Sequence, residues 1–176
     1  MQSKLKSVRW GVVLAILTIL LGFVLGAAMG GAETQIRAYW TASAQPVLST
    51  VYSNDNQKIV AIVERSWKML QRAHMHAAAI GAASLILMYI LACLPVSYLY
   101  KKSIALLLGL GSLGYSLSWL YTAFAAPIVG SVPVAKDAIH ILAVSSIGML
   151  LFGTVVVLAL SLKTLLSSEA AGSEQN

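Results

Sequence analysis

Two histidines and a neighbouring cation stand where a loop meets an apolar segment of this chain. His74 and His76 lie two positions apart in "RAHMHAAAIG", directly after Arg72, and the remaining histidine, His140, begins another apolar segment. Neutral imidazole binds haem iron and other transition metals. Ionisable groups at membrane depth are costly and mark functional sites by default. His74, His76 and His140 are therefore the candidate ligands for a haem or a metal ion.

The spacing of His74 and His76 decides which surroundings they can share. An α-helix turns about 100° per residue, so side chains two positions apart point in directions about 200° apart. The two imidazoles therefore face different neighbours and cannot bind one ion together as residues on one face would. His140 begins a helix that runs in the same direction as theirs, which places all three imidazoles at one depth near the outer surface. We expect His140 to bind haem b together with His74 or His76.

Small and basic residues near the histidines refine this prediction. Small residues beside His74 leave room for a flat macrocycle and favour His74 as the partner of His140; they are Ala73, Ala77, Ala78, Gly81 and Ala82. His76, on the other face, then meets a second cofactor, a haem propionate or a partner subunit. Arg72 and Lys136 lie at the same outer level, and their positive charges suit the propionates of a haem.

The segment "HMHAAAIG" resembles part of a known family of haem proteins. It is similar to the H-x-H segment of haem–copper oxidase subunit I and of smaller haem- or copper-binding membrane proteins related to it, such as the NnrS type. In the oxidase family these two histidines point to opposite faces of one helix and serve two haems, so the resemblance implies ligand roles for His74 and His76. It covers about ten of the 176 residues, and the chain lacks the family's histidine cluster for copper. The resemblance therefore implies haem binding and not oxygen reduction by this chain alone.

The composition of the chain is typical of a membrane protein. Hydrophobic residues make up 59% of the sequence and charged residues 10%, whereas soluble domains carry roughly 25% charged residues. Four apolar stretches reach the roughly 20 residues that a spanning helix needs; they cover about 10–31, 76–99, 103–126 and 138–162. Backbone polar groups in lipid must be satisfied within the segment, so all four are predicted to be helices. The predicted fold class is all-α, an integral membrane four-helix bundle.

The segment before the second membrane helix is predicted to extend that helix outward. Asn54 and Asp55 are good helix caps. Apolar residues then recur at helical spacing, and no proline or glycine interrupts them before Gly81. We therefore predict one continuous helix over residues 56–99, whose first part forms a helical extension at the outer face of the bundle. Nearer the first membrane helix, Tyr39 and Trp40 suit anchors at headgroup level.

The ends of the chain and its basic residues predict a single domain with both termini in the cytoplasm. The four helices form one domain over residues 1–166, and the small polar tail 167–176 is predicted to be disordered. Three basic residues precede the first helix, while Glu33 and Arg37 cancel each other after it, which favours a cytoplasmic N-terminus in a bacterial inner membrane. The net charge of +6 does not indicate nucleic-acid binding, because no basic run exceeds two residues. These cations suit topology and contacts with lipid headgroups.

Glycines in the first membrane helix predict close helix packing. Gly22, Gly26 and Gly30 recur at every fourth position and clear one face, so another helix can approach it closely. The spacing does not say whether that helix belongs to this chain or to another subunit. We expect other membrane subunits to use this face.

Two functions follow from the sequence. The first is a membrane-anchored, b-type cytochrome-like electron-transfer subunit that binds haem near the outer, periplasmic face and exchanges electrons with quinol or a partner complex. Trp119, Tyr121 and Phe124 then provide a flat aromatic surface for a haem or quinone; otherwise they form an interfacial aromatic belt. Copper, with Met75 beside the histidines, is a weaker alternative cofactor, because i,i+2 spacing on a helix suits a shared ion poorly. The alternative function is a cofactor-free accessory subunit of a larger membrane complex.

Overall fold

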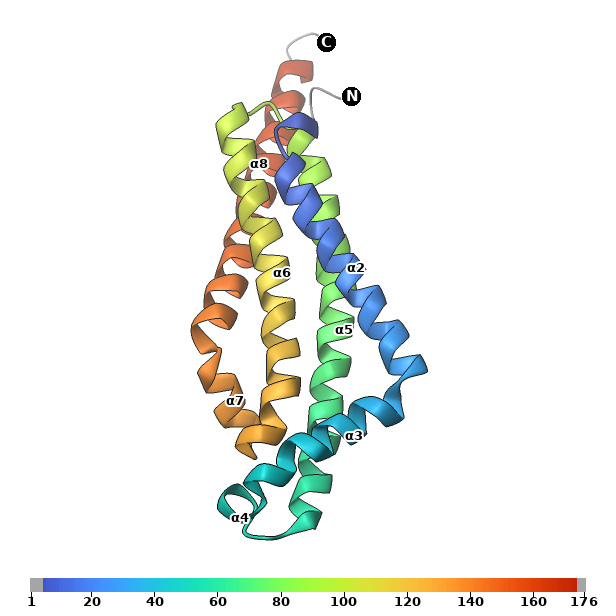
Figure 1. Ribbon diagram of the computed structural model, residues 1–176. Helices are drawn as coiled ribbons and strands as arrows, with labels where there is room; N and C mark the ends of the chain where they lie inside the picture. The colour runs from blue at the N-terminus through green and yellow to red at the C-terminus, as the bar shows by residue number, and fades with distance from the viewer. Residues whose placement is uncertain (1–4, 174–176) are drawn as a thin grey trace.

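The computed structural model describes residues 5–173, with side chains described over residues 5–167. Over residues 5–173 the chain is helical and contains no strand. Four helices are long and apolar enough to cross a membrane, and they pack into the elongated bundle of Figure 1. They are α2 (Arg9–Gly31), α5 (Asn56–Cys93), α6 (Tyr98–Val129) and α8 (His140–Ser173). The predicted all-α membrane bundle is therefore confirmed.

Short helices gather at one end of this bundle. They are α3 (Glu33–Ala44), the 3-10 helix η1 (Gln45–Val47), α4 (Leu48–Val51) and α7 (Val132–Ala138). Figure 1 shows α3 crossing the bundle at this end, whereas α2 begins and α8 ends at the opposite end. We call the short helices, with the first half of α5 and the last turns of α6, the cap. The two ends of the bundle are then the cap end and the terminal end.

Helix α5 runs without interruption from the cap into the bundle, as the sequence predicts. The side chain of Asp55 accepts a hydrogen bond from the backbone N–H of Gln57 and so caps the first turn. The helix ends at Cys93 rather than near residue 99. The reason is Pro95, which disfavours helical geometry at the residue before it.

The last two membrane helices are longer than the sequence predicts. Helix α6 covers Tyr98–Val129 instead of 103–126. Helix α8 follows a one-residue break at Ile139 and extends to Ser173, past the predicted end near 162 and into the segment for which composition predicts disorder. Residues 174–176 of that tail lie outside the described residues.

The cap has an aromatic core of its own. The indole of Trp40 is fully buried and makes edge contacts with Trp67, at 6.2 Å between ring centroids, and with Phe124, at 5.6 Å. The prediction that Trp40 anchors the chain at headgroup level is therefore wrong, whereas Tyr39 is 57% exposed. The reason is the register of α3, which turns successive side chains by about 100° and directs Trp40 against α5 and α6.

Helix α2 packs against α5 through the predicted glycine face. A Cβ atom on Gly22 would lie 2.8 Å from the backbone nitrogen of Ala78, and one on Gly26 would lie 2.8 Å from the imidazole of His74. Gly30 has no such neighbour within 4 Å. The expectation that this face binds another subunit is therefore corrected at Gly22 and Gly26, because α5 of the same chain already occupies it there.

Candidate functional site

His74 lies on the side of α5 that faces α2. Its Nδ1 is 2.8 Å from the carbonyl oxygen of Gly22. A carbonyl can only accept, so Nδ1 carries the proton and donates, and Nε2 keeps the lone pair in the neutral ring. The small residues expected to leave room for a macrocycle beside His74 instead let α2 approach, as the close contact between Gly22 and Ala78 shows.

His76 lies on the side of α5 that faces α6. Its Nδ1 donates to the carbonyl oxygen of Arg72, one turn earlier, at 2.7 Å. Its ring stacks on Trp119, with 5.4 Å between centroids and 28° between planes, and meets the edge of Tyr115 at 5.5 Å. The two neighbouring histidines therefore have different surroundings, as the helix geometry predicts.

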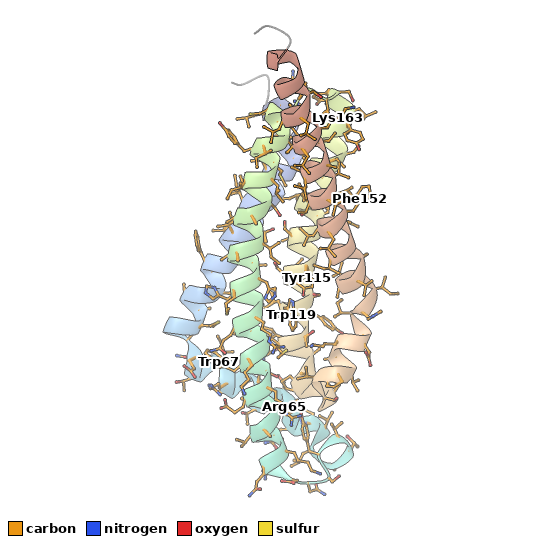
Figure 2. The ribbon with its side chains drawn as sticks, turned by 180° about the vertical axis from the view of Figure 1, so that it is seen from behind. Arg65, Trp67, Tyr115, Trp119, Phe152 and Lys163 are labelled. Carbon is orange, nitrogen blue, oxygen red and sulfur yellow. The ribbon has the colours of Figure 1, made fainter. Side chains whose placement is uncertain are left out.

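Two positively charged side chains from different helices lie over the indole of Trp119. The guanidinium of Arg72, on α5, lies 5.3 Å from the ring centroid, and the ammonium of Lys136, on α7, lies 4.7 Å from it. Such cation–π contacts contribute about 0.5–1 kcal/mol each at exposed sites. Figure 2 shows Trp119 and Tyr115 between α5 and α6. We call Trp119, His76, Arg72 and Lys136 the Trp119 site.

His140 reaches this site from the other side of α6. A pocket of about 250 Å³ opens between α6 and α8, and Trp119, Lys136 and His140 all line it. The rest of its lining is mostly apolar, with Ala143, Val144 and Ile147 on α8. The Nε1 atom of Trp119 is buried and has no acceptor among the described residues.

The structure therefore brings His76, Arg72 and Lys136 together and places His140 beside them. His74 is directed away, toward α2, so the geometry is opposite to the expectation that favoured His74 as the partner of His140. Among the described residues, no group of three or more His, Cys, Asp or Glu side chains could hold a metal ion. Sequence reasoning named Trp119 as part of an aromatic surface but missed Tyr115, although their spacing of four places both rings on one helix face.

A second polar arrangement fixes the cap. Arg37 on α3 donates to Glu33 at 2.7 Å and to Glu64 on α5 at 2.5 Å, and its guanidinium lies 4.8 Å from the centroid of Trp67. Burial opposes the charge of Arg37, but the hydrogen bonds to the two carboxylates outweigh it and raise the pKa of the guanidinium. This network ties α3 to α5 and uses two of the acids at the cap end.

No protein-family model, curated protein or solved structure matches this chain. Its class therefore follows from the fold alone. Four helices that can cross a membrane make it a multi-pass helical membrane protein. Its candidate site is an aromatic and basic cluster, with two histidines, next to a pocket between α6 and α8.

Proposed function

We propose that the protein is a membrane-anchored electron-transfer subunit that binds a b-type haem at the cap end of the bundle. The supporting observation is that one imidazole, His76, and two cations, Arg72 and Lys136, contact the indole of Trp119. A second imidazole, His140, lines the same pocket as Trp119. Histidines are axial ligands of haem, and cations suit its propionates. When bound, haem b would supply a one-electron carrier at the membrane–water boundary.

The hydrogen bond of His76 is one that a metal ligand commonly makes, although His76 contacts Trp119 from the α5 side and does not itself line the pocket. A histidine that binds a metal commonly donates its other ring N–H to a carbonyl or carboxylate, which fixes its tautomer and orientation. His76 has this arrangement, because Nδ1 donates to the backbone carbonyl of Arg72. His140 is exposed at the rim of the pocket. The unpaired N–H of Trp119 is a further donor for a carboxylate or carbonyl oxygen.

The space between α6 and α8 must widen to admit a macrocycle. The pocket of about 250 Å³ is smaller than the roughly 300–1,000 Å³ of typical ligand sites. At this end α8 borders a second pocket, which Leu142 and Tyr121 help to line. We infer that the cap end of α8 moves away from α6 when haem binds.

An absorption spectrum of the full chain, purified from its native membrane, tests the proposal. We expect a Soret band, and a sharp α-band after reduction, from non-covalent haem. His76→Ala and His140→Ala should each lower bound haem at least about tenfold, while His74→Gln, the matched control on the opposite face, should keep it. The absence of a Soret band from the wild-type chain, or haem loss in His74→Gln alone, would contradict the proposal.

A cofactor-free accessory subunit is the second candidate, and the open end of the glycine face favours it, because a Cβ on Gly30 would meet nothing of the described chain within 4 Å. His74 then has a packing role, because it joins α5 to α2 through the carbonyl of Gly22. In this case the wild-type chain has no Soret band. Native gel electrophoresis of solubilised membranes should then show the chain in a larger complex, and His74→Gln should reduce the amount of that complex.

A further inference from the structure

The cap half of α5 carries a row of cations on one face. Lys58, Arg65 and Arg72 stand seven residues apart, a spacing that turns each side chain only about 20° from the one before it around a helix. Lys68 lies beside this row. All four side chains are exposed, and we call them the basic stripe.

The acids at this end do not neutralise the basic stripe. Glu33 and Glu64 are bound to Arg37, and Asp55 caps the first turn of α5. Asp137, on α7, is exposed and forms no ion pair within the described side chains. No stripe residue has an ion pair there either. The stripe is therefore a row of free positive charge, and such a surface attracts and orients an anionic partner.

The length of the stripe decides between a lipid surface and a protein. An α-helix rises 1.5 Å per residue, so Arg65 lies about 10 Å and Lys58 about 21 Å from Arg72 along α5. The headgroup layer adds only about 5–8 Å to each side of the hydrocarbon core. Arg72, which shares the level of Trp119 at the start of the apolar segment, can reach headgroups. With α5 along the membrane normal, Lys58 lies beyond that layer and Arg65 lies at its outer edge.

The far end of the stripe is also hollowed. A pocket of about 250 Å³ lies between Lys58 and Arg65, with Tyr52 and Gly130 among its lining residues. A carboxylate side chain of a partner can enter this pocket and lie between the two cations.

We propose that the basic stripe is the docking surface for an acidic face of a soluble protein. The stripe runs along α5 from Lys58 to Arg72, which contacts Trp119. A protein bound along the stripe therefore reaches the Trp119 site with its membrane-proximal edge. The proposal depends on charge and reach, and it stands whether or not the site binds haem.

Binding of a labelled poly-L-glutamate peptide to the full chain, in nanodiscs of phosphatidylcholine alone, tests this proposal. Fluorescence anisotropy gives Kd at several salt concentrations. We expect Kd to rise with salt, and Lys58→Gln/Arg65→Gln to raise Kd about tenfold at low salt. The control Lys102→Gln/Lys163→Gln removes two exposed cations from the terminal end and should change Kd less than about twofold.

Two outcomes would overturn the proposal. One is an equal loss of binding in the two double variants, which would mean that the peptide senses net charge only. The other is a loss confined to Arg72→Gln/Lys136→Gln, which would mark a headgroup belt at the membrane surface. The charge-matched variants keep all buried residues, so a folding defect does not explain a difference between them.

Discussion

The Nδ1 atoms of His74 and His76 each bind a backbone carbonyl, and this determines what the rings can do. His74 donates to Gly22 on another helix and His76 to Arg72 on its own helix. The first bond joins two helices, whereas the second only orients the ring toward Trp119. Only the ring of His76 lies among the aromatic and cationic groups next to the pocket. His76 is therefore the better candidate haem ligand, and His74 links α5 to α2.

Tyr52 gives a prediction about stability at alkaline pH. Its hydroxyl donates to the carbonyl of Pro127 at 2.5 Å inside the cap, and burial raises the pKa of its phenol. The folded state then holds this proton more tightly than the unfolded state. The contribution of Tyr52 to the free energy of unfolding is complete below about pH 10 and is lost as pH rises above that value.

We expect Tyr52→Phe to lose about 1–3 kcal/mol at neutral pH, because the carbonyl of Pro127 loses its donor. Thermal unfolding in detergent between about pH 9 and 11 should show a smaller fall in Tm for this variant than for the wild type. Parallel curves for the two proteins would mean that the pKa of Tyr52 is the same in the folded and unfolded states, which would contradict the prediction.

Glycine positions set how closely the membrane helices approach. Without a hydrophobic driving force in lipid, helices associate through close packing of small residues. Gly22 contacts the backbone of Ala78 on α5, and Gly111 on α6 contacts the backbone of Ser146 on α8. Backbone atoms cannot rotate away as side chains can. A methyl group at either glycine must therefore separate the helices.

The pair Gly22→Ala and Gly30→Ala tests the interface of α2 with α5. A Cβ at Gly22 would lie 2.8 Å from the nitrogen of Ala78, while one at Gly30 meets nothing within 4 Å. We expect Gly22→Ala to cost about 1–3 kcal/mol and Gly30→Ala to be neutral or stabilising by up to about 1 kcal/mol, through helix propensity. Unfolding by denaturing detergent measures both; equal stabilities would argue against this interface.

The pair Gly111→Ala and Gly148→Ala tests the interface of α6 with α8. A Cβ at Gly111 would lie 2.8 Å from the carbonyl oxygen of Ser146, whereas one at Gly148 is in open space. Gly111→Ala should lower the free energy of unfolding by about 1–3 kcal/mol, and Gly148→Ala should not. Hydrogen exchange of α8 should speed up in Gly111→Ala alone. Unchanged exchange in both variants would indicate that α8 is held elsewhere.

The whole molecule is a membrane bundle whose short helices lie at one end, the cap (Figure 1). Among the described side chains, all the acids lie at the cap end, where Glu33 and Glu64 bind Arg37. The cations of the terminal end, such as Lys102 and Lys163, face no described acid there. Basic residues at the flank of the first membrane helix favour the cytoplasmic side, and Lys6 and Arg9 stand at the terminal-end flank of α2, whereas Arg37 alone follows its cap end closely. We therefore propose that the terminal end is cytoplasmic and the cap is outside.

Cysteine labelling tests this orientation. In a Cys93→Ala background, Ser49→Cys places a thiol on the cap and Ser103→Cys places one at the terminal end; both positions are exposed. A maleimide that cannot cross the membrane should label Ser49→Cys in intact cells and Ser103→Cys only after permeabilisation. The reverse pattern would place the cap in the cytoplasm.

The sequence could predict the features that depend on residues close together in the chain. Asp55, the N-cap residue of α5, predicted where this helix starts, and the absence of proline and glycine before Gly81 predicted its continuity. Pro95 indicates where it ends. The burial of Trp40 was not predictable in this way, because an aromatic pair beside a membrane helix is typical of headgroup anchors. Only the crossing of α3 over α5 and α6 directs Trp40 inward.

The membrane class, the helical elements and the opposite directions of His74 and His76 were determined by the sequence itself, since they follow from local hydropathy and the turn of one helix. The tertiary structure alone decided what lies on each face. It placed α2 against His74 and Gly22, and it placed Trp119 against His76. The physical reason is that these neighbours come from segments far apart in the chain, and close packing between whole helices selects them.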